Sequence, residues 1–266
     1  MKARYTITEI HNIRDILKQV NNDTWVIFDL DNTVIEPFYL SIGSDQWFTM
    51  MCSLSAAKIP DPNEALALTL ALYYEIQHRL HMQLVEHEVA EVIDILHGNG
   101  VPVLALTSRG IDLKETTYRQ LKNLNIHFEH DIIFCSGKNK GVCLQTYLES
   151  KHYKPAHIMM IDDKKKYLEQ VGDIAKALVI HYDGVRYAYL DKKVMDFNLE
   201  SSHKELAVLH PILPPHAKTA IQRLGILVES EDVAHHHYFR FFYFDSEQKQ
   251  SAEDTEQKKQ HHVTMM

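Results

Sequence analysis

The feature that most constrains the fold of this chain is an apolar run that stops abruptly at two carboxylates. Residues 25–28 are Trp-Val-Ile-Phe, and Asp29-Leu30-Asp31-Asn32-Thr33 follows directly. β-Branched and aromatic residues in succession predict a strand buried on both faces, as in the parallel sheets of α/β proteins. Ligand sites in such sheets lie just beyond the carboxyl ends of the strands, which is where Asp29 and Asp31 stand. Two carboxylates so close repel one another, so a site that keeps both ionised needs a cation such as a metal ion. The alternative is a solvated turn, which Asp and Asn also favour.

The same pattern of an apolar run followed by polar residues recurs further along the chain. Residues 101–106 precede Thr107-Ser108-Arg109-Gly110, and residues 157–161 precede Asp162-Asp163-Lys164. A shorter strand is predicted at 131–135, before a helix-like segment at 142–150. Strands that alternate with helices predict a Rossmann-like, three-layer α/β/α fold with a parallel sheet. Because crossovers are short and right-handed, these strand ends should meet at one edge of the sheet.

The segment between the first two motifs is too long for a simple crossover and predicts an inserted helical cap. Residues 64–84 and 85–96 carry apolar side chains at helical spacing, and Asp61-Pro62 is a helix start signal. The domain prediction is therefore a core of residues 1–35 and 98–200 and a cap of residues 36–97. Residues 201–244 are expected to pack on the core, and the polar segment 245–266 to form a disordered tail. Within the core, residues 177–182 predict a strand, and Asp183-Gly184 a turn that leads to an alternating segment at 185–190.

The order of these motifs resembles that of the haloacid dehalogenase-like (HAD) hydrolase superfamily, in an uncharacterised bacterial branch. The four matching features are Asp29-Leu30-Asp31-Asn32-Thr33, then Thr107-Ser108, then a lysine at 140 or 138, then Asp162-Asp163. The resemblance covers residues 24–182. It implies Mg²⁺-dependent phosphoryl transfer to an aspartate, with the cap covering the site and selecting substrates.

The two acids of the first motif have distinct expected roles. Asp29 is the expected nucleophile, since a carboxylate that attacks phosphorus divides one difficult hydrolysis into two easier steps. Asp31 is the expected general acid and base, which protonates the leaving alcohol and then deprotonates the attacking water. Family members that act as dehalogenases lack this second acid. Its presence in this chain therefore favours phosphate esters.

The expected metal ligands also follow from the resemblance. Mg²⁺ takes hard oxygen ligands and keeps several waters, so few protein ligands are needed. The resemblance implies the side chain of Asp29, the backbone carbonyl of Asp31 and one acid of the second pair. Asp163 is the expected ligand, and Asp162 would then orient water or a neighbouring lysine, although the alternative assignment stays open.

Fixed donors around the transferred phosphoryl group should stabilise its charge. Ser108 is the expected hydroxyl donor, with Thr107 as the alternative, and Arg109 either binds the phosphate or lies on the surface. Lys140 is expected near a helix N-terminus that favours anions, with Lys138 as the alternative. Lysines 164–166 are expected to be solvated.

Composition sets further limits. The chain has 266 residues, a formal net charge of -8 and 18 histidines. The acidic balance without a basic stripe argues against nucleic-acid binding, and no apolar stretch is long enough to predict a membrane span. The start of the chain lacks a secretory pattern, which favours a cytoplasmic location, although secretion without a signal stays open. Cysteines 52, 135 and 143 are expected to be reduced, and histidines 235–237 are poor chelators because consecutive side chains diverge.

These observations predict an enzyme that hydrolyses a small phosphorylated substrate. Candidate residues of its pocket follow the first acid pair, with simple packing of the cap as the alternative reading: Glu36, Phe38, Tyr39, Asp45 and Trp47. Two other functions stay open. One is a non-catalytic binding or regulatory protein with the same fold, and the other is a phosphomutase.

Overall fold

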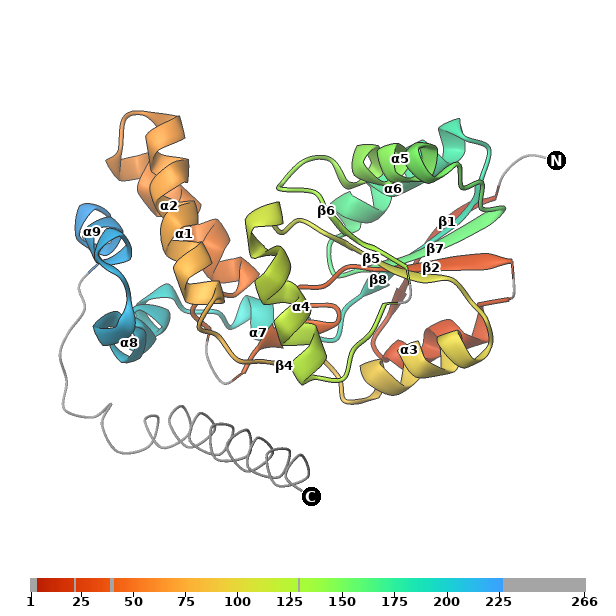
Figure 1. Cartoon of the computed structure of the whole chain (residues 1–266), viewed down its shortest axis with the longest axis horizontal. Coiled ribbons are helices and arrows are strands. Elements are labelled where there is room, and N and C mark those ends of the chain that lie inside the picture. Colours follow the sequence, from red (N-terminus) through yellow and green to blue (C-terminus); the bar gives the residue numbers. More distant parts are fainter. Residues whose placement is uncertain (1–3, 22, 39–40, 129, 227–266) are drawn as a thin grey trace, which may run out of the picture.

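The computed structural model describes residues 4–21, 23–38, 41–128 and 130–226, and in this part of the chain six strands form one parallel sheet (Figure 1). Its strand order is β1-β8-β7-β2-β5-β6. The bounds of these strands are β1 Tyr5–Ile10, β2 Thr24–Phe28, β5 Val103–Thr107, β6 Ile132–Phe134, β7 His157–Asp162 and β8 His181–Tyr187. The predicted α/β fold class is confirmed. The edge strand β1, which pairs with β8, was not predicted from the sequence.

Helices cover both faces of the sheet, which explains the apolar character of its central strand. On one face lie α5 (Lys140–Lys151) and α6 (Lys165–Ala177), and on the other lies α3 (Glu88–Gly98) beside η1 (Ile13–Lys18) (Figure 1). Ile27 of β2 belongs to the core under α5 and α6, whereas Val26 and Phe28 belong to the core on the other face. Strand β2 is thus buried on both sides, as alternating side chains require.

The segment between β2 and β5 forms a helical hairpin and a small second sheet. Helices α1 (Asp45–Lys58) and α2 (Pro62–Gln77) pack together, and β3 (Ile35–Pro37) pairs antiparallel with β4 (Met82–Leu84). Asp61 caps α2 and Pro62 begins it, as the start signal predicts. The expected helix through residue 84 is wrong, because α2 ends at Gln77 and residues 82–84 pair with β3. Helix α3, placed in the cap by prediction, contacts η1 and β5 of the core.

Four short helical elements follow the sheet in the described part of the chain, and two of them pack on the helical hairpin. These are α7 (Asp191–Met195), α8 (Leu199–Leu209), η3 (His210–Ile212) and α9 (Pro215–Arg223). Helix α8 contacts α1, and α9 contacts α2 (Figure 1). Within the segment 201–244, which was expected to pack on the core, α8 and α9 thus lie against the hairpin. Histidines 235–237 and the predicted tail 245–266 lie outside the described residues.

One predicted turn proves to be part of a strand. Asp183 and Gly184 lie inside β8, where Asp183 accepts a hydrogen bond from the Thr6 hydroxyl and interacts with His157 Nε2 at 2.9 Å. A Cβ at Gly184 would lie 3.1 Å from both Ile7 and Tyr182 side-chain atoms, so close packing favours glycine there. The predicted strand at 177–182 begins only at His181, because α6 continues to Ala177. No helix of the described part is both long and apolar enough to cross a membrane.

Candidate active site

The acidic residues lie at the point in the sheet where the order in which the chain adds strands reverses. From the central strand β2 the chain moves to β5 and β6 on one side, and it then returns to β7 and β8 on the other. Ligands of open α/β sheets bind at such switch points, outside the carboxyl ends of the strands. Asp29 directly follows β2 and its backbone N–H donates to the Ile161 carbonyl of β7 at 2.9 Å. The structure thus brings the first acid pair beside the second, Asp162-Asp163.

Three carboxylates form a cluster at this point. Oxygen atoms of Asp29, Asp162 and Asp163 all lie within 4.8 Å of one another. Asp29 is 5% exposed and Asp162 is fully buried. Burying three acids together is costly unless cations or a metal neutralise them. The convergence predicted from the sequence for these three acids is confirmed.

Lys140 supplies one neutralising charge. Its Nζ lies 2.7 Å from Asp29 Oδ1 and 2.7 Å from Asp162 Oδ2, and its side chain is fully buried. Lys140 begins helix α5, which approaches α6 so closely that a Cβ at Gly141 would overlap the backbone of Gln170. Of the two candidate lysines, Lys140 therefore lies in the cluster, whereas Lys138 is exposed.

Burial and charge shift the acidity of the cluster. Burial raises the pKa of Asp29 to about 7, with Lys140 acting in the opposite direction and Asp162 adding to the rise. Burial and the neighbouring Asp162 and Asp29 also raise the pKa of Asp163 well above its ordinary range. Burial alone would lower the pKa of Lys140, but Asp162 and Asp29 together hold it above its usual value. Without a metal ion, Asp29 and Asp163 therefore hold protons more readily than free carboxyls do, and a bound cation would favour their ionised forms.

Asp31 forms a bidentate ion pair with Arg109. Arg109 Nε donates to Asp31 Oδ2 at 2.9 Å, and Nη2 donates to Asp31 Oδ1 at 2.7 Å. Nη1 donates to Thr117 and Gln120 of helix α4 (Lys114–Asn123), so the guanidinium is buried and fixed. From the sequence, Arg109 was expected either to bind the phosphate of the substrate or to lie on the surface. In the structure it orients the second acid of the first motif instead.

The two hydroxyls of the second motif differ in their contacts. Thr107 Oγ1 accepts the backbone N–H of Arg109 at 3.1 Å and so stabilises the loop. Ser108 Oγ is buried and has no hydrogen-bond partner within the described part of the chain. An unpaired buried hydroxyl is costly, and it marks a position where a ligand oxygen or water would complete the hydrogen bonding. Ser108 is thus the better placed of the two for binding an anion.

The donor set of the acid cluster fits a hard divalent cation. Both oxygens of Asp162 already accept hydrogen bonds, Oδ2 from Lys140 and Oδ1 from the Lys164 backbone N–H at 2.8 Å. Within the described part of the chain, Asp163 accepts a single side-chain hydrogen bond, at Oδ2 from Asn32 Nδ2 at 3.3 Å. Asp163 therefore has more free acceptor capacity than Asp162, which agrees with its expected place as the direct ligand. Carboxylate oxygens are the ligands that Mg²⁺ prefers.

The structure adds two residues to the site that sequence reasoning missed. Asn32 has a left-handed backbone with φ of 63°, which turns its amide onto Asp163. Asn tolerates this conformation better than most residues, so its place in the motif was an available signal. Lys164, expected to be solvated, instead pairs with Asp45 at the start of α1, and burial lowers its pKa. Nothing in the local sequence distinguishes it from the exposed Lys165 and Lys166.

Helix α2 brings two tyrosines over the motif loops. Tyr73 is 8% exposed, and its pKa is raised by burial and by the nearby Asp31. Tyr74 lies against Gly110, where a Cβ would overlap its hydroxyl. The helical hairpin thus covers the site directly.

The predicted pocket residues after the first motif take different positions. Glu36 is buried between Gln83 and Lys193, whereas Trp47 packs in the core of the hairpin beside Tyr73. Phe38 is 39% exposed. Tyr39 lies outside the described residues. The three cysteines, all of which are described, are free as expected.

Comparison with known families gives a match over most of the chain. The model of the family DUF2608, described as a protein of unknown function, matches residues 6–131 and 128–210. The match covers most of the sheet, the helical hairpin and every residue of the acid cluster.

Among curated proteins, the chain is similar to three from Chlamydia that carry the name "Putative outer membrane protein". The protein from Chlamydia muridarum is 22% identical over 198 residues, which are 68% of this chain and 76% of that protein. The protein from Chlamydia pneumoniae is 25% identical over 203 residues, which are 70% of this chain and 77% of that protein.

Two solved structures are also similar. A haloacid dehalogenase-like family hydrolase from Streptococcus pneumoniae has a TM-score of 0.44 and 18% identity, over 60% of this chain and 93% of that one. A HAD-superfamily hydrolase of subfamily IA from Geobacter sulfurreducens has a TM-score of 0.41 and 15% identity, over 65% of this chain and 96% of that one.

Proposed function

The chain belongs to the DUF2608 family, whose description assigns no function, and from its site we propose that it is a Mg²⁺-dependent phosphatase. Its substrate is a small phosphate monoester, and the reaction passes through an aspartyl-phosphate on Asp29. The observation that carries the proposal is the cluster of Asp29, Asp162 and Asp163 at the switch point, with Lys140 between two of the acids.

The first half of the reaction uses both acids of the first motif. Asp29 attacks phosphorus, a new bond forms between its carboxylate oxygen and phosphorus, and the bond to the leaving oxygen breaks. Asp31 gives its proton to that leaving oxygen, which departs as an alcohol. Arg109 keeps the Asp31 carboxyl in place while it does so, because both of its oxygens are fixed by the guanidinium. A fixed acid is needed, since proton transfer requires hydrogen-bond reach to the leaving oxygen.

The second half returns the enzyme to its starting state. Asp31 takes a proton from water, the water oxygen bonds to phosphorus, and the bond to Asp29 breaks, which releases inorganic phosphate. Ser108 Oγ, buried without a partner among the described residues, donates to a phosphoryl oxygen in both halves. Bound Mg²⁺, with Asp29, the Asp31 carbonyl and Asp163 as its protein ligands, would neutralise charge on the phosphoryl oxygens.

Hydrolysis of p-nitrophenyl phosphate tests the proposal. We expect turnover by the wild type with Mg²⁺, its loss on addition of EDTA and its return with excess Mg²⁺. Asp29→Asn should have no turnover, because an amide is a poor nucleophile for phosphorus. Asp23→Asn is the matched control, since Asp23 is an exposed acid at the other end of β2. Turnover that survives in Asp29→Asn, or that ignores EDTA, would refute the mechanism.

We also propose a cytoplasmic location. The names of the Chlamydia relatives suggest the outer membrane instead. Fractionation of cells that express the full chain, followed by immunoblotting, distinguishes the two locations. Recovery in the outer-membrane fraction after a salt wash would contradict the proposal.

A further inference from the structure

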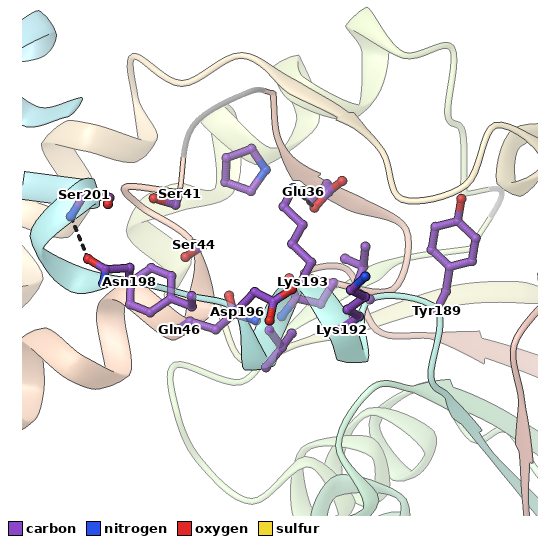
Figure 2. Close-up of a pocket in the computed structure, with 15 residues that line it drawn as sticks. Glu36, Ser41, Ser44, Gln46, Tyr189, Lys192, Lys193, Asp196, Asn198 and Ser201 are labelled. Atoms are coloured by element: carbon purple, nitrogen blue, oxygen red, sulfur yellow. Dashed lines mark hydrogen bonds and ion pairs between the residues drawn. The ribbon is translucent and has the colours of Figure 1, made fainter. Parts of the chain in front are cut away.

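A large cavity adjoins the acid cluster on the side of the C-terminal elements. It has a volume of about 670 Å³ and lies between β3, the start of α1 and the segment 189–201 (Figure 2). Ligand pockets have volumes of roughly 300–1,000 Å³, so the cavity is large enough for a small metabolite. Asn32 lines the cavity and also donates to Asp163, so one residue joins the cavity to the acid cluster.

The cavity is lined by equal numbers of acidic and basic side chains, so their formal charges sum to zero. Glu36 is 6% exposed, and its two oxygens accept hydrogen bonds from Gln83 at 2.8 Å and from Lys193 at 2.6 Å. Figure 2 shows the Lys193 side chain extending toward Glu36, with Lys192 and Asp196 nearby as one further charge of each sign. A charged group in the ligand would therefore meet no net opposite charge from the lining.

The remaining lining combines hydroxyl and amide groups with two aromatic rings and with the apolar Pro37, Leu190 and Val194. The polar groups are those of Asn32, Ser41, Ser44, Gln46, Asn198 and Ser201, and the rings are Tyr189 and Phe197. Amide and hydroxyl groups can both donate hydrogen bonds to and accept them from the hydroxyls of a ligand, and aromatic rings pack against apolar C–H faces. This combination suits a neutral ligand that carries several hydroxyls on a carbon ring or chain.

We propose that this cavity binds the alcohol part of the substrate and that the substrate is the phosphate ester of a sugar or another polyol. The proposal rests on the proposed phosphatase function and specifies its substrate class. The phosphate would lie at Asp29, Lys140 and Ser108, and the hydroxyls would extend past Asn32 toward Glu36 and Tyr189. Segment 189–201, which follows the sheet in the chain, thereby contributes to substrate selection.

The experiment compares three phosphate esters with Mg²⁺ present. D-Glucose 6-phosphate supplies a polyol, O-phosphoserine a charged leaving group, and p-nitrophenyl phosphate an aromatic one. We expect the wild-type kcat/KM for glucose 6-phosphate to exceed that for phosphoserine about tenfold or more, because a site that hydrogen-bonds hydroxyls rejects ligands without them.

Two variants test the residues of the cavity. Tyr189→Ala removes a ring that is 46% exposed, and Glu36→Gln removes the buried charge with little change of shape. Each should lower the ratio of kcat/KM for glucose 6-phosphate to that for p-nitrophenyl phosphate by about fivefold or more, mainly through KM. Tyr118→Ala, which removes a 42% exposed ring of α4 away from the cavity, is the matched control and should keep the ratio within about twofold.

The outcomes separate this inference from the proposed function. Turnover of p-nitrophenyl phosphate without a preference for glucose 6-phosphate, or with a ratio that Tyr189→Ala does not change, overturns the inference and leaves the phosphatase standing. If no ester is hydrolysed, the phosphatase fails. Calorimetric titration of glucose 6-phosphate into Asp29→Asn then decides the inference: binding that Tyr189→Ala weakens supports the cavity as a polyol site, and absence of binding overturns it.

Discussion

At the scale of single residues, the pairing of Asp31 with Arg109 is the contact with the clearest consequence. A planar guanidinium donates hydrogen bonds to both oxygens of a carboxylate at once, and the ammonium group of a lysine does not offer this paired geometry. Arg109 is itself fixed by Thr117 and Gln120 of α4. The direction of the Asp31 carboxyl is therefore set by a buried network that reaches into the next helix.

Arg109→Lys should lower kcat while the protein stays folded. We expect Asp31→Asn to lose roughly 10²- to 10⁴-fold in kcat, as general acid–base groups do, and Arg109→Lys to fall between that variant and the wild type. The pH profile of kcat should also change in Arg109→Lys, since the partner of the acid is altered. A steady-state pH series on both variants checks this. An Arg109→Lys enzyme with wild-type kcat and an unchanged profile would show that Arg109 has only a structural role.

The raised pKa of Asp29 predicts how Mg²⁺ should affect stability. Between the ordinary value of 3.8 and about 7, the folded metal-free chain keeps a proton that the unfolded chain has released. Since stability falls with rising pH wherever the folded state binds more protons, this group destabilises the metal-free protein as pH rises through that range. Mg²⁺ binds the ionised carboxylates, so it should raise Tm more at about pH 8 than at about pH 5. Scanning fluorimetry with EDTA or Mg²⁺ measures this difference, and an equal or larger Mg²⁺ effect at the lower pH would contradict it.

Sequence motifs located most of the site at this scale because each acid stands at the end of an apolar strand. Asp29, Asp162 and Asp163 could be placed together on that basis, whereas Lys140 was inferred from the family resemblance, with Lys138 as the alternative. The roles of Arg109 and Lys164 could not be read, since their partners Asp31 and Asp45 lie 78 and 119 residues away. Such pairs depend on how the helical hairpin and the loops meet, which local spacing does not encode.

At the scale of elements, helix α2 fits closely over the loop after β5. The backbone of Gly110 has φ of -75°, which any residue adopts, so glycine is needed there for contact and not for conformation. A Cβ at this position would overlap the hydroxyl of Tyr74, whereas the next ring atom lies 3.4 Å away. The loop and the helix therefore meet through one phenolic oxygen.

Gly110→Ala should destabilise the protein by about 1–3 kcal/mol, the usual cost of overpacking, and should lower kcat/KM by shifting α2. Tyr74→Phe removes the overlapping oxygen, so the double variant should regain a large part of both losses. Chemical denaturation and kinetics on the two single variants and the double variant measure the coupling. Losses that simply add would show that Tyr74 and Gly110 do not meet in solution.

The secondary-structure predictions succeeded for strands that are identified by burial alone, and they failed where pairing with a distant segment determines the structure. Strands β2, β5 and β7 are apolar on both faces, so their sequences are sufficient to identify them. Residues 82–84 were predicted as helix because their apolar spacing allows it, yet pairing with β3 makes them a strand. The partly exposed β1 gave no clear pattern, because it is an edge strand with a polar sequence.

At the scale of the whole molecule, the C-terminal helices stabilise the hairpin that covers the site. Leu206 of α8 is fully buried, and α8 and α9 contact α1 and α2. The sequence could not show which surface these helices cover, since their apolar faces would suit the core as well as the hairpin.

Leu206→Ala should destabilise the protein by about 2–5 kcal/mol, as large-to-small changes in a packed core do. If the C-terminal helices support the hairpin, hydrogen exchange should quicken most in α1 and α2 and least in β5 and β7. Exchange measured by mass spectrometry on the variant and the wild type gives this comparison. An increase that is uniform over sheet and hairpin would refute a local role for α8.

The most direct test of the central claim is detection of the phosphorylated enzyme. The wild type is mixed with Mg²⁺ and substrate, quenched in acid within the first turnover and examined by intact-mass and peptide mass spectrometry. We predict one added phosphoryl group, labile to alkali, on the peptide that contains Asp29, and none on Asp29→Asn. Turnover of substrate with no phosphoryl group on the chain, or with the group on another residue, would contradict the assignment of Asp29 as the nucleophile.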